Sequence, residues 1–98
     1  DIKNYKSNYN KSPGCTQKEI DGLEAILNDG FTDTFRALHP EEVKYSWWSY
    51  RFNSREKNTG WRLDYFLTSD RILNNVKTAE IHNNIFGSDH CPVSITLV

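Results

Sequence analysis

Residues 45–66 read YSWWSYRFNSREKNTGWRLDYF and contain all three tryptophans of the chain. Aromatic and polar residues alternate in two runs, 45–52 and 61–67, on either side of a polar connector that contains Asn-Thr-Gly. Period-two runs flanking such a connector predict a strand, a loop and a strand. Large aromatics occupy both faces of the first run, so it is either buried on both sides or has one face committed to a ligand. We expect Trp48 and Tyr50 to be core aromatics.

Asp64 interrupts the apolar pattern of the second run. A carboxylate inside a strand is costly to bury unless a partner pairs with it, so Asp64 needs an explanation. A second carboxylate, Asp89, precedes His90 in a loop that leads into the last run of the chain. A histidine with a carboxylate partner can act in acid–base catalysis or stabilise charge. An isolated Asp-His dipeptide, however, is more often only a solvated loop.

The composition indicates one small globular domain. The chain has 98 residues, of which 37% are hydrophobic and 13% aromatic, and its formal charge is −1. No overall basic field therefore points to a nucleic acid, yet four cations lie close together in the central stretch: Arg51, Arg55, Lys57 and Arg62. Cys15 and Cys91 lack the spacing of a metal site or a disulfide framework, which favours two reduced thiols in an intracellular protein. No apolar run approaches the ~20 residues of a membrane span.

The remaining elements follow from local signals. In chain order we expect a loop at 1–14, a helix from a cap at Thr16 to Asn28, a short helix at 31–38 begun at Asp33, a turn at 69–75, a strand at 76–81, a loop at 85–92 and a strand at 93–98. Phe35 and Leu38 are core candidates, and Ile72 and Leu73 are expected to pack inward. Helices followed by several strands indicate an α+β layered domain, with mostly antiparallel strands and flanking helices.

The motifs GWRLDYF and GSDHCPV, with YSWWSYRFNSREKN ahead of them, closely resemble the C-terminal part of the exonuclease III family of abasic-site (AP) endonucleases. The likeness runs through the whole chain. It implies that residues 1–98 are the C-terminal half of a four-layer α/β sandwich of the DNase I-like kind, a portion of a single domain whose N-terminal half lies upstream. A chain that begins at Asp1 and has no methionine leads to the same expectation.

The resemblance also implies roles for the two carboxylates and the histidine. His90 would contact the scissile phosphate, and Asp64 would accept the other ring N–H of His90. Asp89 would coordinate a metal ion or place a water molecule. If the strand of Asp64 and the loop of His90 run side by side, a hydrogen bond of about 2.6–3.2 Å between the two side chains is expected.

Three residues, Trp47, Trp61 and Leu63, match the family's pocket for an extrahelical abasic sugar. A rigid apolar pocket accepts a deoxyribose that lacks its base and excludes a normal nucleotide. Arg51 matches a position that faces the DNA groove in the family. Three further residues are candidate phosphate contacts, with a solvated loop as the alternative: Asn53, Arg55 and Lys57.

The resemblance implies a Mg²⁺-dependent AP endonuclease, with Mn²⁺ as a possible substitute, that cuts 5′ to abasic sites and processes 3′ ends. Its substrate would be double-stranded DNA with an abasic site or a blocked 3′ end. We expect a monomer in the bacterial cytoplasm or nucleoid, or in the eukaryotic nucleus. Residues 1–98 alone should be inactive, because the family's main metal ligands lie upstream.

Two alternatives remain. One is another DNase I-like phosphoesterase, such as a retroelement endonuclease or a lipid phosphatase, against which Trp47 and Trp61 argue. The other is a non-catalytic structural or DNA-binding fragment.

Overall fold

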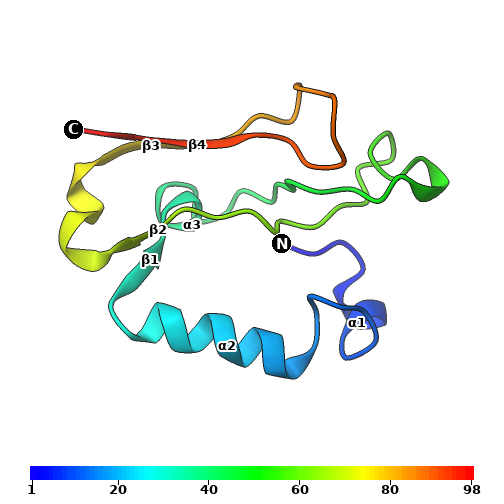
Figure 1. The fold of residues 1–98 in the computed structure, drawn as a ribbon, viewed down its shortest axis with the longest axis horizontal. Coiled ribbons are helices and arrows are strands. Elements are labelled where there is room, and N and C mark those ends of the chain that lie inside the picture. The colour runs from blue at the N-terminus through cyan, green and yellow to red at the C-terminus, as the bar shows by residue number, and fades with distance from the viewer.

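The computed structural model describes residues 1–98 as an α+β arrangement with two antiparallel strand pairs (Figure 1). The helices are α1 (Tyr5–Asn8), α2 (Gln17–Asn28) and α3 (Thr34–Leu38), with 3₁₀ turns η1 (Arg51–Asn53) and η2 (Asp70–Asn75). The strands are β1 (Phe31–Asp33), β2 (Leu67–Ser69), β3 (Val76–Ile81) and β4 (Val93–Leu97). β1 pairs with β2, and β3 pairs with β4. The expected fold class of helices with antiparallel strands is therefore confirmed.

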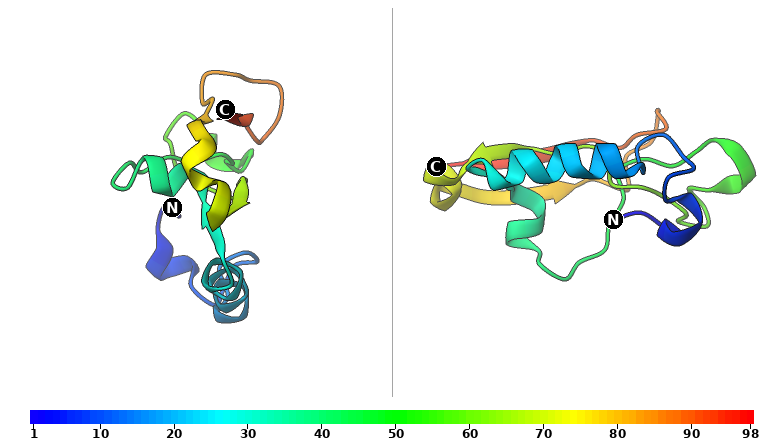
Figure 2. Two further views of the ribbon diagram at one scale, coloured as in Figure 1. Left: turned by 90° about the vertical axis from the view of Figure 1, so that its left-hand side faces the viewer. Right: turned by 90° about the horizontal axis from the view of Figure 1, so that it is seen from below.

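The molecule is thin, with extents of 41 × 31 × 21 Å. The β3–β4 pair runs along one edge, α2 runs along the opposite edge, and the long central segment passes between them (Figures 1 and 2). Only 14 of the 98 residues are buried. None of the helices is long and apolar enough to cross a membrane.

The main core lies between α3, the central segment and the β3–β4 pair. Six buried residues form it: Phe35, Tyr45, Trp48, Ala79, Ile81 and Cys91. Leu38 packs against this cluster, as its spacing from Phe35 predicts. Tyr50 was expected in the core, but it is 80% exposed, because the chain turns away from the core at η1. Ile72 is likewise exposed on η2, which corrects the expectation that it packs inward.

Helix α2 begins at the predicted cap. The Thr16 hydroxyl accepts a hydrogen bond from the backbone N–H of Glu19 at 3.3 Å and donates to the Glu19 carboxylate at 3.0 Å. The carboxylate thus binds the hydroxyl of the cap residue instead of its backbone N–H. No residue of α2 is buried, so its apolar positions have no complete partner within residues 1–98.

The predicted helix at 31–38 is only partly correct. Phe31–Asp33 forms β1, which pairs antiparallel with β2, and the helix is confined to Thr34–Leu38. Asp33 ends the strand and caps the helix, because its carboxylate accepts from the backbone N–H of Arg36 at 3.2 Å. Tertiary pairing with a segment far along the chain overrides the local helical signal here.

The predicted central strands at 45–52 and 61–67 are not regular strands. Three isolated bridges form instead: Trp61 pairs with Ile2 and with Trp47, and Trp47 also pairs with His90. The backbone N–H groups of both Ser46 and Trp47 donate to the carbonyl of Trp61, so two residues oppose one, as in a β-bulge. Beyond Tyr50 the chain enters η1, where Phe52 has φ +56°. The ladder is therefore interrupted on both sides of the tryptophan pair.

The C-terminal prediction agrees with the structure, with β3 at Val76–Ile81 and β4 at Val93–Leu97. The connection between them, residues 82–92, carries Asp89 and His90 on the side of the central segment. Cys15 and Cys91 are both buried and free, as expected.

Candidate active site

Asp64 and His90 form a hydrogen-bonded pair. The Nδ1 atom of His90 lies 2.8 Å from Oδ2 of Asp64, so the predicted contact is present. Both side chains remain partly open, with relative exposures of 43% for His90 and 34% for Asp64. The Nε2 atom of His90 makes no hydrogen bond within the chain and is free to act on a bound molecule.

The two partners are not neighbours in a sheet, which corrects the expected side-by-side placement. The segment of Ser46 runs between them, since Trp47 bridges to Trp61 on one side and to His90 on the other. The fully buried Ser46 hydroxyl accepts from the backbone N–H groups of Leu63 at 3.0 Å and Asp64 at 3.1 Å.

Ser46 also holds the segment on the histidine side. Its carbonyl accepts from the backbone N–H of Cys91 at 2.9 Å. Ser46 therefore fixes the spacing of Asp64 and His90 from both sides. Sequence reasoning missed this residue; the only signal was a small polar side chain between two aromatics of an apolar run.

Trp47, Trp61 and Leu63 come together as predicted and line a hollow of about 520 Å³. The two indole rings meet edge to face, with centroids 6.0 Å apart and planes at 79°. The opposite wall comes from the N-terminal loop and includes Asn4 and Asn8. Sequence reasoning passed over this wall, because nothing local indicated that a polar loop would face the tryptophans.

Gly14 allows the N-terminal loop to approach Trp61 closely. Its φ of +90° belongs to the left-handed region that glycine favours. A Cβ atom at this position would lie 3.0 Å from the Trp61 ring. The loop wall of the hollow therefore depends on a residue without a side chain.

Asp89 is tied to the tryptophan pocket. Its Oδ2 atom accepts from the Trp47 indole N–H at 3.1 Å, and its backbone carbonyl accepts from the N–H of Trp48 at 3.0 Å. The pKa of Asp89 lies below its ordinary value, mainly because of the Trp47 hydrogen bond. Desolvation raises this pKa, whereas other hydrogen bonds and the charge of His90 lower it further. Asp89 therefore stays ionised and orients the Trp47 ring.

Replacing Trp47 by phenylalanine should raise the pKa of Asp89 toward the ordinary value of about 3.9, because the ring persists while the N–H that stabilises the carboxylate is lost. An NMR titration of the Asp89 side-chain carboxyl measures this shift directly. The unsubstituted protein, titrated under the same conditions, is the reference. An Asp89 pKa that stays in place in Trp47→Phe would contradict the assigned hydrogen bond.

The basic cluster of the sequence separates into different environments. Arg62 is buried and its guanidinium donates to both carboxylate oxygens of Asp33, at 3.1 and 2.7 Å. Arg55 is half-buried and donates to backbone carbonyls. Three candidates for DNA contact remain on the surface at and after η1: Arg51, Asn53 and Lys57.

A sequence profile of the Endonuclease/Exonuclease/phosphatase family matches residues 6–90. The chain is 45% identical over 98 residues to the DNA repair nuclease APEX1 of Danio rerio and 42% identical over 98 residues to an exodeoxyribonuclease of Bacillus subtilis. Each alignment includes 99% of this chain but only 31% and 38% of the respective relative. The chain thus spans about a third of the length of these relatives.

A solved structure with a similar fold is that of the AP endonuclease LMAP of Leishmania major. The superposition gives a TM-score of 0.74 at 37% identity and covers 82% of this chain and 24% of that chain. The α+β arrangement described above is therefore the fold of part of a DNase I-like nuclease, as the sequence motifs implied.

Proposed function

This chain belongs to the endonuclease/exonuclease/phosphatase family, and we propose from that membership that it is the C-terminal part of a DNA-repair phosphodiesterase. The missing N-terminal half of the same domain would complete the fold. The whole protein would incise DNA 5′ to abasic sites and process 3′ ends. The names of its relatives, a DNA repair nuclease and an exodeoxyribonuclease, support this assignment.

The observation that carries the proposal is the Asp64–His90 pair beside the pocket of Trp47 and Trp61. Asp64 fixes the orientation of the imidazole through Nδ1, at 2.8 Å, and leaves Nε2 free. A carboxylate that accepts the Nδ1–H of a histidine fixes the orientation of its ring and the placement of its other nitrogen. The free Nε2 would then lie at a phosphoryl oxygen of the substrate.

In the proposed reaction a water oxygen attacks phosphorus in line and the bond from phosphorus to the 3′ oxygen breaks. The leaving oxygen takes up a proton and becomes a 3′-hydroxyl. Negative charge on the phosphoryl oxygens grows in the transition state, and a preoriented donor in a partly desolvated site stabilises it. His90 supplies this donor, and Asp64 supplies the compensating negative charge.

The substrate would be double-stranded DNA in which an abasic sugar enters the 520 Å³ hollow. The edge-to-face indoles form rigid apolar walls that accept a sugar without a base. Arg51, Asn53 and Lys57 are exposed at and after η1, where they would position the duplex through phosphate contacts.

Nucleases of this family depend on a metal ion. No group of three or more His, Cys, Asp or Glu side chains in this chain is placed to hold an ion. Mg²⁺ requires nearly octahedral oxygen ligation. We propose that Mg²⁺, or Mn²⁺ in its place, binds mainly through residues outside 1–98, with Asp89 as a ligand that this chain could add.

Its relatives include a DNA repair nuclease of a eukaryote and an exodeoxyribonuclease of a bacterium. We accordingly place the whole protein in the compartment that holds the DNA, the cytoplasm or nucleoid of a bacterium or the nucleus of a eukaryote. We propose that it acts there as a monomer.

The full-length protein should cut a duplex with a single abasic site in Mg²⁺ and leave a 3′-hydroxyl that a polymerase can extend. The same duplex without the lesion is the matched control and should stay uncut at that position. Equal cutting of both duplexes, or hydrolysis of an inositol phosphate lipid in their place, would contradict the assignment.

Residues 1–98 alone should show no metal-dependent incision, because the main metal ligands are proposed to lie outside this chain and no residue of α2 is buried. The assay uses the same abasic duplex with the purified fragment. Turnover that copurifies with the fragment through every step, and disappears in a His90→Asn version, would contradict this expectation.

A further inference from the structure

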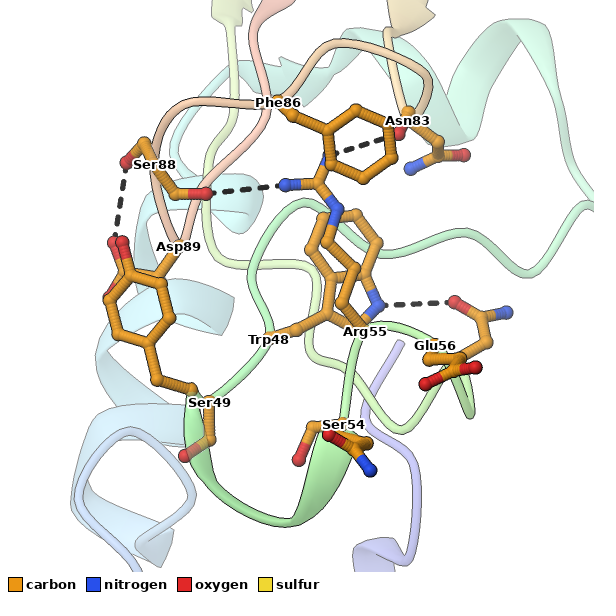
Figure 3. A pocket seen from close by; sticks show the side chains of 12 residues that line it. Trp48, Ser49, Ser54, Arg55, Glu56, Asn83, Phe86, Ser88 and Asp89 are labelled. Carbon is orange, nitrogen blue, oxygen red and sulfur yellow. Dashed lines mark hydrogen bonds between the residues drawn. The ribbon is translucent and has the colours of Figure 1, made fainter.

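Arg55 connects the central segment to the loop that carries Asp89 and His90. Its Nη2 atom donates to the backbone carbonyl of Asn83 at 2.9 Å and its Nη1 atom to that of Ser88 at 3.2 Å (Figure 3). Nη2 also donates to the backbone carbonyl of Ile85 at 2.7 Å. Three of the five N–H donors of the guanidinium are thus committed to one loop. A fourth, on Nε, is buried within the protein.

The guanidinium is also held from both faces. It lies between the rings of Trp48 and Phe86, with its Cζ atom 4.5 Å from the first centroid and 4.2 Å from the second (Figure 3). A planar cation between two aromatic faces is stabilised electrostatically. Trp48 is itself nearly inaccessible, at 3% exposure, and its indole N–H donates to Asn58 at 3.1 Å. We call the arrangement of Arg55 between Trp48 and Phe86 the clamp. Because Trp48 belongs to the main core, the clamp is anchored there.

The clamped segment leads directly to the site. Residues 82–92 connect β3 to β4 without regular structure. Arg55 holds this loop from Asn83 to Ser88, and the next residues are Asp89 and His90. The backbone N–H of Trp48 donates a hydrogen bond to the backbone carbonyl of Asp89 at 3.0 Å.

We propose that Arg55 is a positioning residue for the Asp89–His90 loop and not a phosphate contact. The contacts of Arg55 leave little of its guanidinium for DNA. Lys57, two residues further along the chain, is exposed and makes no ion pair within the chain. The inference rests on the proposed phosphodiesterase function, because the loop matters only if His90 acts on the substrate.

Two substitutions in the full-length protein separate the roles. Arg55→Lys keeps the charge but loses the planar fork, so a phosphate contact would tolerate it and the clamp would not. Arg55→Gln removes the charge. For both we expect the single-turnover incision rate constant to fall by about 10- to 100-fold, since a displacement of about 1 Å at a site can cost that much. Single-turnover rates do not depend on the fraction of active enzyme in the sample.

Binding separates the clamp from a phosphate contact. The slope of log Kd against log salt should stay the same in Arg55→Gln, whereas loss of a phosphate contact lowers it by about one. Lys57→Gln is the comparison that should lower the slope. Arg71→Gln removes an exposed cation on η2, outside the site, and should change neither the slope nor the rate.

Two further variants test how Arg55 acts. Adding Arg55→Gln to His90→Asn should reduce the rate little further, because a residue that works through His90 loses its effect when His90 is absent. Phe86→Ala opens one wall of the clamp at a residue that is 73% exposed, so the fold persists. The rate should fall about two- to fivefold, as expected for the loss of a cation–aromatic contact.

A wild-type rate in Arg55→Lys together with a reduced salt slope in Arg55→Gln would overturn the clamp and make Arg55 a phosphate contact. Fully additive losses in the double variant would overturn the action through His90. Failure of the wild-type protein to cut abasic DNA would instead refute the proposed function, which distinguishes the two hypotheses.

Discussion

Replacing His90 by asparagine in the full-length protein is expected to lower the incision rate constant by about 10²- to 10⁴-fold, the range that a positioned acid–base group contributes. The reason is the free Nε2 atom, which asparagine cannot replace as a chargeable donor at the phosphate. Asp64→Asn should cost a similar amount, because the amide cannot balance the imidazolium that the carboxylate faces at 2.8 Å. The measurement is single-turnover cleavage of an abasic duplex.

The double variant tests whether the two residues act as one unit. Asp64→Asn with His90→Asn should be little slower than the slower single variant, since coupled residues lose their contribution once. Losses that multiply fully would mean that the two side chains work separately. His82→Asn is the matched control, because His82 bonds the Ser94 hydroxyl at 2.8 Å, away from the pair, and its loss should leave the rate constant nearly unchanged.

Gly60→Ala should give the largest loss of stability among single-methyl additions to this chain. A Cβ atom at position 60 would lie 2.5 Å from Nε1 and 2.6 Å from Cδ1 of Trp48, and 2.8 Å from the carbonyl oxygen of Trp47. Neither a core indole nor backbone can yield easily. Overpacking of this kind costs about 1–3 kcal/mol or more of the free energy of unfolding.

Gly22→Ala is the matched control for this substitution. Gly22 lies inside α2, and a Cβ atom there would meet nothing within 4 Å. The same added methyl should therefore stabilise the protein by about 0.5–1 kcal/mol, the helical preference of alanine over glycine. Denaturant unfolding of both variants gives the comparison. Equal effects of the two substitutions would contradict the crowded packing of Gly60 against Trp48.

Some features of this protein follow from the sequence because they depend on local interactions. The Thr16 cap of α2 and the alternation that gives β3 and β4 involve residues within a turn or a pleat of one another. A carboxylate in an apolar run indicated that Asp64 needs a partner, and the family resemblance implied that this partner is His90, which the 2.8 Å contact confirms. The family followed from the same motifs.

Other features were decided by tertiary structure. The aromatic alternation at 45–52 predicted a strand, yet only Trp47 pairs, because the bulge at Trp61 and the turn at η1 interrupt the ladder. The alternation places Trp48 in the core and Trp47 in the pocket. It fails at Tyr50, which is exposed.

Partner choice was equally invisible in the sequence. The Ser46 hydroxyl accepts from the backbone N–H groups of Leu63 and Asp64. The Arg55 guanidinium donates to backbone carbonyls of the loop before Asp89. A hydroxyl or a guanidinium satisfies whichever backbone groups the fold brings within about 3 Å. Local patterns in the sequence indicate residue types suited to the chemistry and the starts of α2, β3 and β4. The contacts of Ser46 and Arg55 arise only in the folded chain, because their partners lie far apart along the sequence.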